Sequence, residues 1–148
     1  MSITERPWGA ENAKPLPTTG PDPSLKPTYG SATLKAGHRH HPLVTKLTAG
    51  GSIKTRLGGV NAYVAKAPTF HLNYKAGQYP LTFRVAAQAD TTLLIKLPDG
   101  TWIANDDGGA GRNPLIHLPN PRSGRYHVYV GTYGPNPAPA RLYIADRQ

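Results

Sequence analysis

Short runs in which apolar and polar residues alternate fill the sequence from residue 43 onward. In the run 69–74, Phe70, Leu72 and Tyr74 fall on one face and the residues between them on the other. A period of two residues is that of a β-strand, because successive side chains of a strand point to opposite faces. No segment keeps a helical period for more than a turn or two. The chain is therefore expected to be all-β.

Four further runs show the same alternation clearly, and three more show it weakly. The clear runs are 79–87, 91–98, 124–133 and 140–146, and the weak ones are 43–50, 61–68 and 113–119. The chain contains 16 glycines and 16 prolines, which supply turns between the runs. A length of 148 residues leaves room for one domain. These features predict a single antiparallel β-sandwich, jelly-roll-like, with seven to eight strands.

Residues 1–42 differ from the rest of the chain. They hold few apolar side chains and seven prolines, at positions 7, 15, 17, 21, 23, 27 and 42. Such a segment favours polyproline II and leaves its backbone groups free to pair with another chain. We expect an extended proline-rich N-terminal arm over 1–42 that reaches a neighbouring subunit, followed by the sandwich domain over 43–148. The first charges of the chain are not followed by an apolar run, so no secretory signal is expected as the sequence is written.

The net charge limits the partners. The chain carries a formal charge of +9 and a pI near 10.0, which favours an anionic partner such as nucleic acid, acidic polysaccharide or an acidic protein surface. No run of five or more Lys or Arg residues is present, so the charge is expected to be spread over a folded surface. The absence of cysteine excludes disulfides and thiol nucleophiles and leaves the compartment open.

Eight basic or aromatic residues occupy positions opposite the expected core pattern. They are His71, Arg84, Lys96, Arg125, His127, Tyr129, Arg141 and Tyr143. Together they would form a basic face with interleaved aromatics, which could stack sugars or bases and neutralise anions. The alternatives are a solvated sheet face and a contact with a neighbouring subunit. Because Tyr and Arg are enriched in protein interfaces, protein contact is favoured over nucleic acid.

Acidic residues cluster where the rest of the chain has few. Four of the 8 acidic residues lie between positions 90 and 107, and with Asn105 they form a candidate oxygen-ligand set for Ca²⁺: Asp90, Asp99, Asn105, Asp106 and Asp107. The alternative is that 98–100 is a plain hairpin turn and that the paired aspartates accept backbone N–H bonds from the following glycines. This alternative is favoured, because the spacing is not that of an EF-hand. The pair could also anchor Arg112 or Arg125.

Other candidate chemistry is weak. The segment 38–41 reads His-Arg-His-His, which suggests Zn²⁺ or Cu²⁺ ligation, but a polar surface segment within the arm is favoured. The sequence has no G-x-S-x-G elbow, and its serines lie in the arm or in turns. Asp106 and Asp107 are adjacent in one loop, so they are poorly placed to face each other across a glycoside. We therefore expect no enzyme activity.

Several stretches, in order, resemble a known domain family. They are "AGGSIKTRLGG", "APTFHLNY", "ADTTLLIKLPDGTWIANDDGGAGRNP", "SGRYHVYVGTYG" and "ARLYIAD". Over about residues 48–146 the chain resembles the bacterial pre-peptidase C-terminal type of β-sandwich domain. The resemblance implies a non-catalytic accessory domain of secreted proteins, some members of which bind calcium. Similar domains often carry cysteines where this chain has Asn61 or Ala62 and Ala104, so the disulfide of the family is absent and stability is expected to come from elsewhere, such as oligomerisation.

These observations lead to two functional expectations. The first is a non-catalytic, self-assembling subunit of a surface or filamentous assembly, or of a virion coat, joined through its N-terminal arm. The second is a carbohydrate- or polyanion-binding accessory module of a secreted protein, or a virion decoration protein. An accessory domain severed from a protease would follow from the resemblance alone. The expected location is extracellular or at the cell surface, with no cofactor apart from the candidate Ca²⁺.

Overall fold

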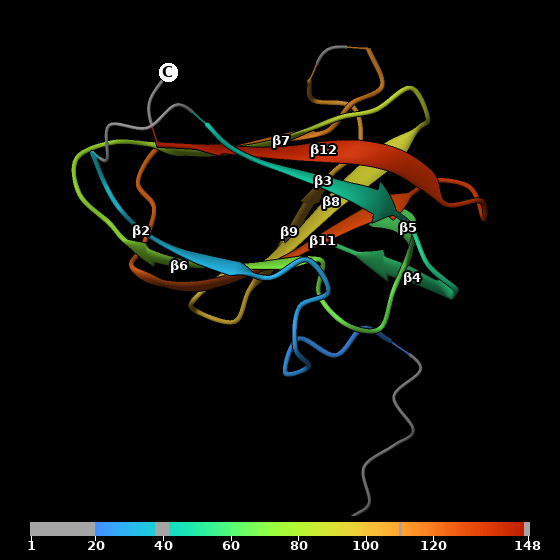
Figure 1. The fold of residues 1–148 in the computed structure, drawn as a ribbon, viewed down its shortest axis with the longest axis horizontal. Coiled ribbons are helices and arrows are strands. Elements are labelled where there is room, and N and C mark those ends of the chain that lie inside the picture. The colour runs from blue at the N-terminus through green and yellow to red at the C-terminus, as the bar shows by residue number, and fades with distance from the viewer. Residues whose placement is uncertain (1–19, 38–41, 110, 147–148) are drawn as a thin grey trace, which may run out of the picture.

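The computed structural model describes residues 20–37, 42–109 and 111–146, and these form eleven strands in two sheets without a helix (Figure 1). The predicted β-sandwich is confirmed, and all eight predicted runs are strands. The bounds are β2 (Ser31–Lys35), β3 (Leu43–Ala49), β4 (Ile53–Leu57), β5 (Val60–Val64), β6 (Phe70–Lys75), β7 (Leu81–Ala86), β8 (Thr91–Lys96), β9 (Trp102–Asn105), β10 (Leu115–Leu118), β11 (Gly124–Thr132) and β12 (Ala138–Ala145). The described part of the chain holds no helix long and apolar enough to cross a membrane.

Two sheets enclose the main core. The smaller sheet has the order β10-β7-β12-β3, and all its pairs are antiparallel. The larger sheet has the order β2-β6-β11-β5-β4, and β8 and β9 join it through β11. The apolar residues that alternate along the strands meet between the sheets, as the pattern predicts, and include Phe70, Leu72, Phe83, Val128 and Leu142.

A second, smaller cluster lies on the other face of the larger sheet. Leu94 and Tyr129 are 0% and 1% exposed, although alternation predicts that both point outward. They pack with Ala62 and Val64 of β5, and with the partly buried Ile53, Leu57, Trp102 and Ala104. The prediction that Tyr129 is exposed is therefore wrong. The β4–β5 hairpin pairs with β11 only at Tyr63–Thr132, and it packs over Leu94 and Tyr129 as a third layer. Ala62 and Ala104 lie in this same cluster.

The segment before residue 43 is partly built into the fold. β2 pairs in parallel with β6, so the sandwich is not wholly antiparallel, and the sandwich begins earlier than residue 43. The physical reason is that Ala32 and Leu34 pack against the main core. Residues 20–30, here called the strap, lie beside the loop before β6: the amides of Asp22, Thr28 and Tyr29 donate to the carbonyls at positions 66, 68 and 69. The remainder of the expected arm, residues 1–19, and the histidine-rich segment 38–41 lie outside the described residues.

Candidate binding face

The eight predicted surface residues are divided between the two sheets. Arg84, Arg141 and Tyr143 belong to β7 and β12 of the four-stranded sheet. The other five belong to β6, β8 and β11 of the seven-stranded sheet. Because the outer faces of a sandwich point in opposite directions, the single basic face that the sequence predicts is two separate surfaces.

The surface on the seven-stranded sheet is largely covered. His71 is 5% exposed and Tyr129 is 1% exposed. The Tyr129 hydroxyl donates to the carbonyl of Lys66 at 3.2 Å. Burial raises the pKa of the Tyr129 phenol well above its usual range. The exposed Arg125 donates from Nε to Asn73 Oδ1 at 2.8 Å. The described residues on this side of the molecule therefore offer no open basic and aromatic platform.

The outer face of the four-stranded sheet is open and cationic, and we call it the cationic face. Its outward residues are Val44, Lys46, Thr48, Thr82, Arg84, Ala86, Leu115, His117, Pro139, Arg141, Tyr143 and Ala145. The guanidinium of Arg84 lies 3.9 Å from the ring centre of Tyr143, directly across the β7–β12 pair. This cation–π contact positions the Arg84 side chain on the face, where it remains exposed.

Two like charges face each other on the cationic face. Arg141 of β12 is the register partner of Lys46 of β3, and both side chains are exposed. Like charges directly opposite on one face of an antiparallel pair destabilise the sheet. None of the four strands of this sheet contains Asp or Glu to offset them. An anion bound between Arg141 and Lys46 would remove this repulsion.

Two hollows shape the cationic face. A hollow of about 480 Å³ lies at Arg141 and Lys46, and its lining includes Ala86, Gln88 and Pro139. A second, of about 250 Å³, is lined by Arg84, Val85, Ala86, Gly109, Asn113, Pro114 and Leu115. The small side chain of Ala86 borders both hollows, and a guanidinium lines each of them. The face can thus receive an extended anionic chain along more than one site.

Sequence reasoning missed two basic members of the cationic face, Lys46 and His117. Lys46 lies in a run whose alternation is weak, yet the outward positions Val44, Lys46 and Thr48 keep the period of two. His117 is exposed on β10, where its Nδ1 lies 2.8 Å from Thr82 Oγ1. Tracing the period of two through the weak runs would have found both residues.

The acidic residues do not form the predicted set. Asp90 precedes β8 and Asp106 follows β9, so the β8–β9 hairpin brings them to its open end. Burial and the nearby carboxylates of Asp107 and Asp106 raise the pKa of Asp90, although the charge of Arg112 opposes this. Within the described ranges, however, no group of three or more acidic, histidine or cysteine side chains is arranged to hold a metal ion.

Two of the candidate ligands have other roles. Asp99 lies in the closed turn of the same hairpin, a strand length away from Asp90, and its Oδ1 accepts from the Thr101 amide at 2.9 Å. Hydrogen bonds to Thr101 lower the pKa of Asp99. Asn105 Oδ1 accepts from the amides of Gly108 and Leu115, at 2.6 and 3.1 Å. Asn105, rather than the pair Asp106 and Asp107, therefore fixes the glycine-rich loop. Calcium binding by the acidic residues stays a prediction.

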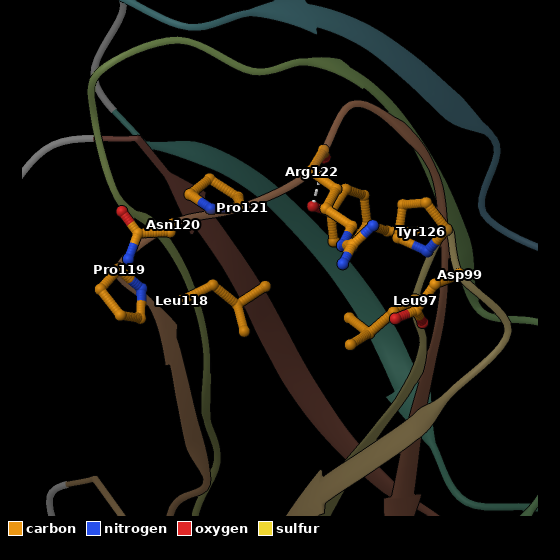
Figure 2. A pocket seen from close by; sticks show the side chains of 9 residues that line it. Leu97, Asp99, Leu118, Pro119, Asn120, Pro121, Arg122 and Tyr126 are labelled. Carbon is orange, nitrogen blue, oxygen red and sulfur yellow. Dashed lines mark hydrogen bonds between the residues drawn. The ribbon is translucent and has the colours of Figure 1, made fainter.

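One further pocket, of about 200 Å³, opens between the β8–β9 turn and the β10–β11 loop (Figure 2). Its residues are Leu97, Pro98, Asp99, Leu118, Pro119, Asn120, Pro121, Arg122 and Tyr126. The Tyr126 hydroxyl donates to the Arg122 carbonyl at 2.6 Å, so its polar atom is already used. The pocket is smaller than most ligand sites and holds no candidate acid–base pair, so it suits one apolar side chain rather than a reaction.

No protein-family model matches the sequence, and no curated protein matches it. A solved structure with a similar arrangement is Aeromonas hydrophila PliG, a periplasmic lysozyme inhibitor of g-type lysozyme. It is 12% identical to this chain, with a TM-score of 0.44 over 78% of this chain and 96% of that one. A likeness at this level does not bear on function.

Proposed function

We propose that the protein is a non-catalytic module that binds an acidic polysaccharide on its cationic face. The observation that carries the proposal is the juxtaposition of Arg141 and Lys46 on a face whose strands contain no acid. An arrangement that costs stability in the free protein is explained if a bound anion offsets the cost.

The shape of the face supports an extended ligand. The Arg141–Lys46 pair lines the larger hollow, and Arg84 lines the smaller one. The Tyr143 ring carries the Arg84 guanidinium on its face and so positions this cation beside the smaller hollow. Carboxylate or sulfate groups along a sugar chain would thus meet successive cations, and binding would weaken as salt screens the charges.

Titration with dextran sulfate, with neutral dextran as the reference, tests the proposal. Binding should occur only with the sulfated polymer, and R141Q or K46Q should weaken it roughly threefold to tenfold per charge removed. The matched control is K54Q, because Lys54 is an exposed lysine on β4 of the other sheet. If K54Q weakens binding as much as R141Q, the cationic face is not the site.

A second candidate function is assembly through the N-terminal segment. The parallel β2–β6 ladder and the strap's backbone bonds could equally be supplied by the same segment of a second copy. Light scattering of the full chain across a range of concentrations tests this idea. A monomer at every concentration would remove its support, while an oligomer would be compatible with both functions.

Three expectations from the sequence stay predictions. They are the resemblance to the pre-peptidase C-terminal domain, the extracellular or cell-surface location, and calcium binding near Asp106 and Asp107. The first two agree with a ligand of the acidic-polysaccharide class, which is abundant on cell surfaces.

A further inference from the structure

Two histidines meet beneath the strap. His71 of β6 and His127 of β11 are register partners, and His127 Nδ1 lies 2.9 Å from His71 Nε2. The rings are perpendicular, with centroids 4.6 Å apart. A hydrogen bond between two imidazoles needs one N–H and one bare nitrogen, so at least one ring must be neutral.

The strap closes over this pair. Both imidazoles are within hydrogen-bonding reach of the Pro23 backbone, whose only polar group is its carbonyl. His71 is 5% exposed. Backbone bonds hold the strap before and after Pro23. The Asp22 amide donates to the Lys66 carbonyl at 2.8 Å, and the Thr28 amide donates to the Pro68 carbonyl at 2.9 Å. Between these two backbone bonds, the Pro23 carbonyl of the strap faces the two histidines.

The charges that face the pair are positive. Lys96 of β8 is the register partner of His127, and Arg125 precedes His127 by two residues on the same face of β11. Both cations act on His127, and Arg125 also acts on His71. β2 places Ser31 opposite His71, and its one charge, Lys35, lies opposite Lys75 at the far end of the strand. The strap adds one exposed cation, Lys26. The strap's own acid, Asp22, accepts from the Ser24 amide and hydroxyl and interacts with Lys66, so it does not offset a charge on the pair.

We propose that His71 and His127 form an acid-sensitive clasp that holds the strap on the seven-stranded sheet at neutral pH and releases it in mildly acidic solution. When both rings are protonated, the bond between them is lost and two cations are added beside Lys96 and Arg125. Release of the strap lets water reach the rings and reduces the repulsion.

The direction of the pH dependence follows from the environment of the rings. Burial, together with the neighbouring cations, lowers the pKa of His71 and brings that of His127 from its ordinary 6.5 to about 4, although hydrogen bonding to the Pro23 carbonyl acts in the opposite direction. A released ring regains water, although Lys96 and Arg125 stay beside it. Its pKa then lies closer to the ordinary 6.5, so the open state binds more protons as the pH falls. The contribution of the histidine pair to the closed state of the strap is therefore complete above about pH 6.5, and it decreases progressively toward pH 4. Between pH 7 and 4.5 the equilibrium constant for opening should rise on the order of tenfold to a hundredfold.

Hydrogen exchange of the full-length protein, read residue by residue by NMR and corrected for intrinsic rates, measures this opening. The amides of Asp22, Thr28 and Tyr29 should lose protection by that factor between pH 7 and 4.5, while the amides of β12 in the other sheet keep theirs. In H127Q, which retains a hydrogen-bonding side chain without a titrating ring, the pH dependence of the strap amides should flatten. The matched control is H117Q, since His117 is exposed on the opposite sheet and should leave the dependence intact.

Two results of the exchange experiment would overturn the clasp. One is a pH-independent protection of the strap amides in the native protein, and the other is an equal pH dependence in H127Q and in the native protein. The NMR titration of the native histidines gives a second measurement that needs no variant. If both His71 and His127 titrate near 6.5 while the strap amides remain protected, protonation does not open the strap.

Discussion

The chemistry of Asp90 depends on residues that follow it by sixteen and seventeen positions. Asp106 and Asp107 are carried to it by the β8–β9 hairpin, and their charges help to raise its pKa. The positive charge of Arg112 acts in the opposite direction on the pKa of Asp90, so it partly offsets the repulsion among the three carboxylates. This balance explains how three acids can share one end of a hairpin in a protein that has few acids.

The substitution D107N should lower the pKa of Asp90 toward its ordinary value of 3.8, because it removes the largest repulsive charge acting on that carboxyl. With its pKa raised, Asp90 favours the folded state below pH 3.8 and loses this contribution as the pH rises through the folded-state pKa. D107N should therefore reduce the gain in stability that Asp90 supplies in acid. Carboxyl NMR titration measures the shift, and D99N, in the closed turn, is the control. An unchanged pKa in D107N would show that the charge of Asp107 does not act on Asp90.

The β4–β5 hairpin depends on the two glycines that connect its strands. Gly58 and Gly59 have φ values of +58° and +82°, as a two-residue turn of type I′ requires. A Cβ at Gly58 would lie 2.8 Å from the amide nitrogen of Ala104, whereas a Cβ at Gly59 would meet nothing within 4 Å. Of the two turn glycines, only Gly58 lies against β9. This close approach lets the β4–β5 hairpin pack over the second cluster.

These two positions give a matched pair of substitutions. G59A should cost about 1 kcal/mol of unfolding free energy, from the positive φ alone. G58A carries the same strain and also forces β4–β5 away from β9, so it should cost at least about 2 kcal/mol more. Urea denaturation of both variants measures the difference. Equal losses would mean that the hairpin does not rest on β9 in solution.

The alternation of residue types predicts where strands occur better than it predicts whether their outward residues are exposed. It identifies the eight runs from residue 43 onward, and it assigns Phe83 and Val128 correctly to the core. It misses β2, β4 and β9, which have five, five and four residues and no fully buried position. It also assigns Leu94 and Tyr129 to solvent, because a period of two separates two faces without showing that a hairpin covers the second one.

The candidate site was predictable only in part, for a similar reason. Arg84, Arg141 and Tyr143 were identified as outward residues, and they are. Which outward residues share a surface depends on the sheet to which each strand belongs, and this is set by long-range pairing. The Arg141–Lys46 contact joins residues 95 positions apart, and no local pattern indicates it.

The whole molecule has three layers where β8 and β11 are covered on both sides. Leu93 of β8 points into the main core and Leu94 into the second cluster, and both are 0% exposed. A strand buried on both faces links the two clusters mechanically, because neither can lose its packing without exposing β8. The strap lies mainly on the side away from the cationic face, but its Tyr29 hydroxyl accepts from the Thr48 amide of β3 at 3.0 Å. Opening of the strap would therefore free one amide at the edge of the cationic face.

This link makes the unfolding of the two clusters a single event. L93A and L94A should each cost roughly 2 to 5 kcal/mol, since each leaves a cavity beside a fully buried side chain. The transition should be monitored by far-UV circular dichroism for the whole fold and by Trp102 fluorescence for the second cluster, in a W8F background that leaves Trp102 as the one tryptophan. The two probes should give the same midpoint in both variants, because the sheet that carries one cluster carries the other. A fluorescence midpoint that falls in L94A while the circular dichroism midpoint holds would mean that the β4–β5 layer unfolds by itself, and the hairpin would then be an appendage of the sandwich and not part of its core.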